Sequence, residues 1–235
     1  MQKEYDALIK NGRWRLVDPP AGIKPIGFKW IYKTKFKADG SLEKRKARLV
    51  EKGYAQKGSI DYTETFAPIA KWGTIRSLFA IAAQKEWKIH HMDVKTAFLN
   101  GDLKEDVYMF QLEGFSVKGK EQKVCKLMKS LYGLKQAPRA WYEKLTEHLL
   151  NLNYKHFDLD DATLFVKKVV RSVVYLVVYV DDLMITGNND EYISSIKKEL
   201  KKVFDMTDLG LLHYYLGIEV DKKPQHIFIS QKKYV

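Results

Sequence analysis

Residues 173–187 read VVYLVVYVDDLMITG, an apolar run that is interrupted only by the adjacent Asp181 and Asp182. Apolar runs of this length, bounded by turn residues, are typical of buried strands. A two-residue connection between such strands predicts a hairpin, and here both connecting residues are aspartate. Because an ionised carboxylate is costly near a core unless it is paired or binds a metal, the pattern indicates a rigid platform for a divalent cation. A solvated turn without a ligand is the alternative interpretation.

The composition favours a globular protein with a polyanionic partner. The 235 residues are 46% hydrophobic and 13% aromatic, which supports a core and differs from a disordered chain. The net charge of +12 favours nucleic acid first and an anionic membrane surface second. The single cysteine, Cys125, excludes an internal disulfide and a cysteine-based metal site. We recognise no signal peptide and no membrane span, and we therefore expect a soluble intracellular protein.

Helix and strand patterns follow one another irregularly along the chain. Residues 3–10 form a short polar helix candidate, and apolar spacing predicts helices after an N-cap at Thr74, from Pro138 onward and over 190–203. Alternation predicts strands over 88–94, 107–110 and 163–170, and a last hairpin from 216–220 and 226–230. Since no regular strand–helix–strand period is present, we expect an α+β fold with an antiparallel sheet.

Residues 28–50 predict a basic hairpin. Aromatic residues alternate with lysines up to a turn at residues 38–41, and the returning strand carries Lys44, Lys46 and Arg48. One interpretation is a lysine-rich edge that prevents aggregation. We favour a surface that faces phosphate groups, because lysine and arginine are dense in this segment.

Asp93 is the best candidate for a third carboxylate. It lies at the end of the strand predicted over 88–94. If it meets Asp181 and Asp182 in the fold, these carboxylates can hold two divalent ions about 3.5–4 Å apart, as in two-metal phosphoryl transfer. Taken alone, Asp93 would more simply cap the end of a strand.

A series of short blocks follows one fixed order along the chain. The blocks are KARLVEKGYAQ (46–56), YTETFAPI (62–69), MDVKTAFLNG (92–101), KSLYGLKQAPRAW (129–141), YVDD (179–182) and LGIE (216–219). Together they resemble the reverse transcriptase domain of copia-type LTR retrotransposons almost from end to end. An ordered series of this kind is far more specific than any one short motif.

The resemblance implies a right-hand polymerase fold in which an antiparallel palm sheet packs on helices. It implies a single domain over residues 1–235, with fingers at approximately 13–90 and 110–140 and palm at approximately 91–109 and 141–220. The start of a thumb would follow at approximately 221–235. Because the chain ends soon after the block that resembles the primer grip, we expect a truncated or absent thumb.

The resemblance also implies an RNA-directed DNA polymerase. Such an enzyme adds deoxynucleoside triphosphates to a primer 3′-hydroxyl and releases pyrophosphate, with two Mg²⁺ ions as cofactors and Mn²⁺ as a substitute. The implied partners are an RNA or DNA template with its primer, deoxynucleotides, and the RNase H and integrase parts of a Pol polyprotein, without a membrane. The implied location is the cytoplasm, within virus-like particles if the element is active.

The site residues implied by the resemblance fall into three groups. Asp93, Asp181 and Asp182 would be the catalytic, metal-binding carboxylates, with Asp93 and Asp181 the stronger ligands by position and Asp182 the weaker. The backbone carbonyl of Val94 would complete the metal site. The nucleotide would contact Lys46, Arg48, Phe98, Tyr132 and Gln136. The primer and template would contact Tyr179, Val180, Pro138, Arg139, Leu216 and Gly217. Phe98 would reject a 2′-hydroxyl by steric clash, although a core phenylalanine is an equal interpretation of this position.

Other functions stay open from the sequence. A truncated, catalytically silent remnant would fold and bind nucleic acid without extending a primer. The short segment after the primer grip favours this interpretation. Phe110 and Leu112 stand where the family usually has a polar residue and a proline, a kind of drift that a decaying element shows, although we expect it to be tolerated. A nuclease or nucleotide cyclase with a similar two-metal palm is a third hypothesis. The intact Asp93, Asp181 and Asp182 favour the polymerase.

Overall fold

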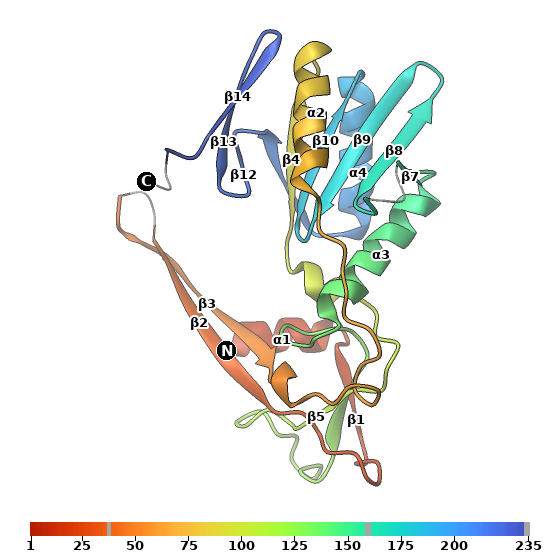
Figure 1. Ribbon diagram of the computed structural model, residues 1–235. Coiled ribbons are helices and arrows are strands. Elements are labelled where there is room, and N and C mark those ends of the chain that lie inside the picture. The colour runs from red at the N-terminus through yellow and green to blue at the C-terminus, as the bar shows by residue number, and fades with distance from the viewer. Residues whose placement is uncertain (37–38, 158–160, 233–235) are drawn as a thin grey trace. The chain divides into compact units, whose positions relative to one another are not determined.

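The computed structural model describes residues 1–36, 39–157 and 161–232 (Figure 1). In these residues helices combine with antiparallel sheets, which confirms the predicted α+β class. The described part of the chain divides into two compact units. The first unit comprises Met1–Ala67 and Phe98–Lys144, and the second comprises Pro68–Ala97 and Leu145–Val235. None of the described helices is long and apolar enough to cross a bilayer.

The first unit contains a helix, a small sheet and a long hairpin. Its elements are α1 (Gln2–Lys10), β1 (Trp14–Val17), β2 (Phe28–Phe36), β3 (Leu42–Glu51), η1 (Gly53–Ala55), β5 (Tyr108–Met109) and β6 (Val124–Leu127). The small sheet has the order β1-β6-β5, and β2 pairs with β3. The predicted basic hairpin is therefore confirmed, although Lys37 and Ala38 of its turn lie outside the described residues. Trp30 and Leu49, paired across the hairpin, pack into the core of this unit.

The second unit is built on a larger antiparallel sheet. Its strands are β4 (Ile89–Val94), β7 (Lys155–His156), β8 (Leu164–Val169), β9 (Ser172–Tyr179), β10 (Asp182–Gly187) and β11 (Met206–Leu211). Within the described residues they pair in the order β11-β4-β10-β9-β8-β7. A smaller sheet follows from β12 (Tyr214–Tyr215), β13 (Ile218–Lys223) and β14 (His226–Ser230). The hairpin predicted near the end of the chain is thus present as β13 and β14.

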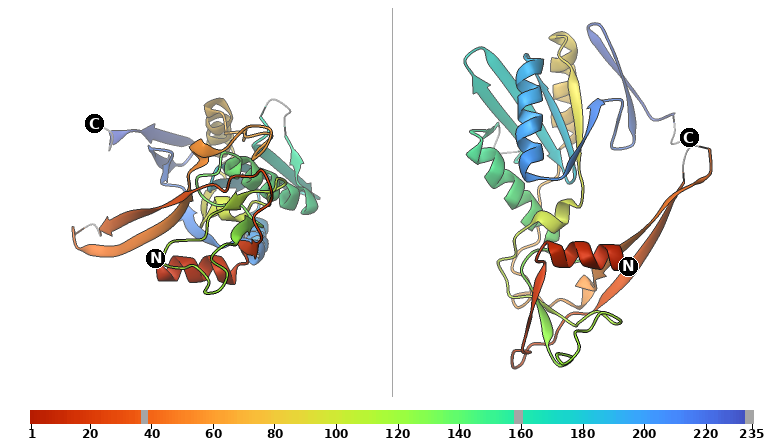
Figure 2. Two further views of the ribbon diagram at one scale, coloured as in Figure 1. Left: turned by 90° about the horizontal axis from the view of Figure 1, so that it is seen from below. Right: turned by 180° about the vertical axis from the view of Figure 1, so that it is seen from behind.

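Helices cover both faces of the larger sheet. Figure 1 shows α2 (Trp72–Gln84) in front of the sheet, and the view from behind in Figure 2 shows α4 (Asp190–Val203) on the opposite face. Ile75, Leu78 and Phe79 of α2 share a core with Val177 and Met184 of the sheet. The helix α3 (Ala137–Asn151) contributes residues to both units, and η2 (Ala97–Asn100) lies at the boundary between segments of the two.

The sequence predicted that Thr74 caps α2, but the structure shows that it does not. The helix begins at Trp72, and the Thr74 hydroxyl donates a hydrogen bond to the carboxylate of Asp161. The prediction was wrong because this partner lies far away in sequence. By contrast, α4 has a side-chain cap, since Asn189 accepts a hydrogen bond of 2.9 Å from the N–H of Tyr192.

The connection between β9 and β10 differs by one residue from the prediction. Tyr179 pairs with Asp182, so the loop residues are Val180 and Asp181, and Asp182 is the first residue of β10. Asp182 belongs to the strand because its backbone pairs with Tyr179 of β9 and with Asp93 of β4, and its carboxylate also contacts His91 of β4. Val180 has a φ of 56°, which is unusual for a β-branched residue and is required by the tight turn.

Candidate active site

Asp93 and Asp182 lie directly opposite each other on β4 and β10. Opposite residues of antiparallel strands share one face of the sheet, with Cβ atoms about 4.5–5.5 Å apart. Both side chains are half-buried. Because like charges directly opposite each other are destabilising, this arrangement favours the binding of a cation between the two carboxylates.

Asp181 and Val94 lie at the same end of the sheet. The N–H of Val94 donates a hydrogen bond of 2.8 Å to the backbone carbonyl of Asp181. This bond ties the loop after β9 to the residue that follows Asp93. Val94 is buried and pairs with Met206 of β11, whereas Asp181 is exposed. The structure therefore brings together the three aspartates and Val94 that the sequence singled out.

The donor chemistry of this cluster fits Mg²⁺. Among the described residues, no group of three or more His, Cys, Asp or Glu side chains is arranged to hold a metal ion. Mg²⁺ does not require such a cage, since it usually takes one or two carboxylates and completes its octahedron with water and substrate phosphates. Asp93 and Asp182 supply such a pair, and Asp181 is the adjacent residue in the chain.

His91 also belongs to this site, although no sequence motif pointed to it. An ionised carboxylate can only accept hydrogen bonds, so the His91 Nε2–H donates to Asp182 Oδ1, at 2.6 Å. The His91 ring meets the Tyr215 ring edge-on, with centroids 5.6 Å apart. Burial, and secondarily the charge of Asp182, raise the pKa of the Tyr215 hydroxyl. The position of His91 in the sequence could have identified it, because residues two apart on a strand share a face and His91 precedes Asp93 by two.

Three of the predicted nucleotide-binding residues gather in the first unit. The Arg48 guanidinium lies over the Tyr132 ring, 5.5 Å from its centroid. The Phe98 ring meets Tyr132 edge-on at a centroid distance of 6.1 Å. Phe98 also packs against the core of the unit while remaining partly exposed, so both interpretations of this residue are compatible with its position. Lys46 lies two residues from Arg48 and therefore shares its face of β3.

Gln136 and Arg139 are engaged within the first unit. Gln136 is only 3% exposed, and its amide accepts a hydrogen bond from Gln56 and donates one to the backbone carbonyl of Asp61. Arg139 forms an ion pair of 2.9 Å with Glu143 and donates to the carbonyl of Phe66. A buried amide with both atoms paired has little capacity for a ligand.

The remaining predicted contacts lie at strand ends and helix starts. Pro138 is half-buried in the first turn of α3. Tyr179 ends β9 and packs, with Leu216, against the core that contains Met184. Leu216 and Gly217 connect β12 to β13 and both have positive φ, 49° and 86°, the pattern of a type I′ turn.

One face of the β2–β3 hairpin is strongly basic. The register places Lys33 opposite Lys46 and Lys35 opposite Lys44. Lysines directly opposite each other repel, so this face costs stability in the free protein. A phosphate backbone bound there would relieve the repulsion, which favours the phosphate-facing interpretation over a simple protected edge.

Comparison with known proteins identifies the family. The family model for reverse transcriptase (RNA-dependent DNA polymerase) matches residues 11–235. The Pol polyprotein of transposon RE1 from Arabidopsis thaliana is 44% identical over 236 residues, and that of transposon TNT 1-94 from Nicotiana tabacum is 43% identical over 237 residues. The chain belongs to the copia-type reverse transcriptases. The resemblance seen in the sequence blocks is thereby confirmed.

This reverse transcriptase domain corresponds to a small part of its relatives. Both alignments cover all of the chain but only 16% and 18% of the RE1 and TNT 1-94 polyproteins. Among solved structures, the foamy viral protease–reverse transcriptase in complex with double-stranded DNA matches with a TM-score of 0.41 and 15% identity. That match covers 92% of this chain and 32% of the viral chain.

Proposed function

We propose that this domain is an RNA-directed DNA polymerase that adds deoxynucleotides to a primer 3′-hydroxyl on an RNA or DNA template. The observation that carries the proposal is the placement of Asp93 opposite Asp182, with Asp181 in the adjoining loop. In a right-hand polymerase fold, the sheet of the second unit would be the palm and the basic hairpin would belong to the fingers. Residues from approximately 221 onward would begin a thumb.

The second unit would hold the reacting groups. Asp93, Asp181 and Asp182 would bind two Mg²⁺ ions, which, when present, lower the pKa of the attacking hydroxyl and stabilise the leaving oxygen of an in-line displacement. Asp93 and Asp182 are on paired strands, so their carboxylates are held in place before the substrate arrives. The tight turn at Leu216 and Gly217 would support the primer end.

The first unit would bind the triphosphate and the template. Lys46 and Arg48 present positive charges that can stabilise the transferring phosphoryl groups. Phe98 would exclude a 2′-hydroxyl by steric clash. The basic face of the β2–β3 hairpin would neutralise template phosphates, so binding should weaken steeply as the salt concentration rises.

The domain would act as part of a larger protein. The relatives that it matches are Pol polyproteins, so we propose that RNase H and integrase accompany it, in the cytoplasm and within virus-like particles. A silent remnant that only binds nucleic acid is the second candidate. The engagement of Gln136 and Arg139 in contacts within the first unit favours that candidate, since both were expected to contact substrate.

Product analysis separates these functions. A 5′-labelled primer annealed to an RNA template is incubated with the chain, Mg²⁺ and all four deoxynucleotides. Longer products would support the polymerase, and shortened primer would indicate a nuclease. An unchanged primer together with salt-sensitive template binding would support the remnant.

A further inference from the structure

The hydrogen bond between His91 and Asp182 is partly shielded from water. Its length is 2.6 Å, and the side chains are 12% and 28% exposed for His91 and Asp182, respectively. A hydrogen bond to an ionised carboxylate is about twice as strong as a neutral one, and a low local dielectric strengthens it further. This contact therefore constrains the Asp182 carboxylate more than an exposed ion pair would.

The orientation of His91 is itself fixed from its other side. The Tyr215 ring stands at 83° to the imidazole, an edge-to-face arrangement in which rotation of His91 would lose contact. Tyr215 is buried in the same core as Met184, and its hydroxyl has no hydrogen-bond partner among the described residues. Tyr215 thus acts on His91 through its ring, and the ring of His91 acts on Asp182.

The bond leaves one carboxylate oxygen of Asp182 for a cation. His91 donates to Oδ1, so Oδ2 keeps its lone pairs for a cation, and Asp182 shares its face of the sheet with Asp93. Without His91, repulsion between the opposed carboxylates would turn Asp182 away from Asp93. We propose that His91 is a positioning residue that holds the Asp182 carboxylate in the orientation that binds the divalent cation. This inference rests on the proposed function, since it takes Asp93 and Asp182 as cation ligands.

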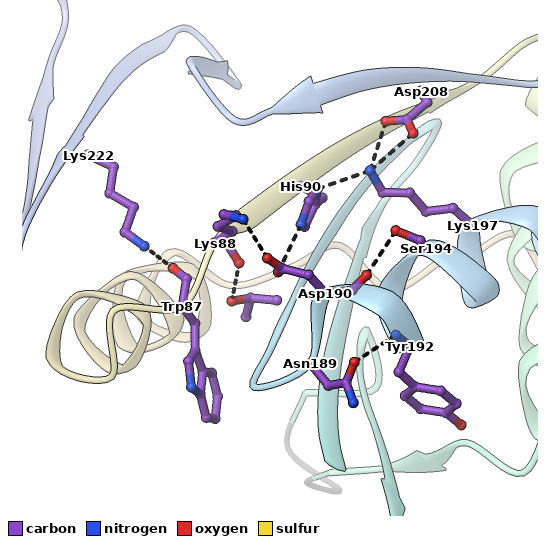
Figure 3. A network of polar contacts seen from close by, with 11 residues as sticks. Trp87, Lys88, His90, Asn189, Asp190, Tyr192, Ser194, Lys197, Asp208 and Lys222 are labelled. Atoms are coloured by element: carbon purple, nitrogen blue, oxygen red, sulfur yellow. Dashed lines mark hydrogen bonds and ion pairs between the residues drawn. The ribbon is translucent and has the colours of Figure 1, made fainter.

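His90 provides a matched control on the same strand. It lies on the opposite face of β4, where its Nδ1 is 3.0 Å from the ammonium of Lys197. Figure 3 shows that Lys197 also binds Asp208, and that Asp190 lies near His90 and pairs with Lys88. This network ties α4 to β4 and β11 without contacting Asp182. A change at His90 therefore tests damage to β4 apart from any effect on Asp182.

The test is a titration of the full chain with Mn²⁺, in which electron paramagnetic resonance measures the concentration of the free ion. Residues that do not bind a metal but orient its ligands typically contribute about 10–100-fold to the metal affinity. His91→Leu should therefore weaken Mn²⁺ binding by about that factor. His91→Gln should retain most of the affinity, because its amide can still donate to Asp182. His90→Gln should bind as the wild type does. Thermal unfolding of each variant checks that the fold is retained.

The other outcomes would overturn the positioning role of His91. Wild-type affinity in His91→Leu would overturn the positioning role while leaving the proposed function intact. Equal losses in His91→Leu, His91→Gln and His90→Gln would also overturn it, because they would reflect general damage to β4. Asp93→Asn is measured beside them, and unchanged binding in Asp93→Asn, or no saturable binding by the wild type, would refute both the metal site and the inference.

Discussion

Glu51 should make the stability of the protein fall as the pH rises. This residue ends β3 and is 2% exposed, and neither carboxylate oxygen has a hydrogen-bond partner in the described part of the chain. Burial raises the pKa of Glu51 from 4.5 to about 8. Between these pKa values the folded protein holds a proton that the unfolded chain has released, so the free energy of unfolding decreases as the pH increases.

The size of the effect follows from the two pKa values. Linkage gives a loss on the order of 3 kcal/mol in the free energy of unfolding between pH 5 and pH 8. Glu51→Gln keeps the shape of the side chain but cannot ionise, so the variant should lose much less stability over this range. The stability difference in favour of Glu51→Gln should be largest at pH 8 and small at pH 5.

Urea unfolding at pH 5, 6, 7 and 8 measures this difference. All other titratable groups are the same in both proteins, so the comparison isolates Glu51. Glu43→Gln, an exposed glutamate on the same strand, is the control and should follow the wild type. If Glu51→Gln and the wild type change in parallel with pH, Glu51 does not titrate in the folded core and the reasoning is refuted.

Lys33→Glu should stabilise the β2–β3 hairpin by about 0.2–1 kcal/mol in urea unfolding, because a carboxylate would then face Lys46. The same variant should bind primer–template more weakly and with a shallower salt dependence by fluorescence anisotropy, and an unchanged slope would count against the basic face. Trp141→Ala should lower the free energy of unfolding by about 3–5 kcal/mol, since Trp141 is 1% exposed; a loss below about 1 kcal/mol would contradict its place in the core. Burial, and secondarily Lys197, hold the pKa of His90 below 6.5, so its contribution to stability is present above pH 6.5 and lost in acid. Unfolding below pH 6.5 should therefore be less pH-dependent in His90→Gln than in the wild type, and identical acid profiles would exclude this role.

Much of the fold could be predicted from local patterns. Alternation located β4 and the β2–β3 hairpin, because a half-buried strand must alternate apolar and polar residues, and a continuous apolar run located β9. β11 was missed, since its residues MTDLGL contain no clear alternation and its pairing with β4 includes a bulge. The exact turn after β9 was also missed, because it depends on the positive φ of Val180 and on the pairing of Asp182 with Asp93 of the distant strand β4.

The candidate site was predictable in its residues but not in their partners. The family blocks point to Asp93, Asp181 and Asp182, and the structure places them at one end of one sheet. No local pattern could show that Gln136 binds the backbone of Asp61, because this contact joins segments 75 positions apart. The role of His91 depends in the same way on two neighbouring strands.

Primer extension decides whether Asp93, Asp181 and Asp182 form a polymerase active site. Wild type, Asp93→Asn and Asp205→Asn are compared on an RNA template with Mg²⁺ and four deoxynucleotides, and template binding is measured in parallel. Asp205 is an exposed carboxylate that pairs with Lys95, so its variant controls for the loss of a negative charge. We expect extension by the wild type and Asp205→Asn, and none by Asp93→Asn although it still binds the template. Extension by Asp93→Asn at the wild-type rate would contradict the assignment of the active site.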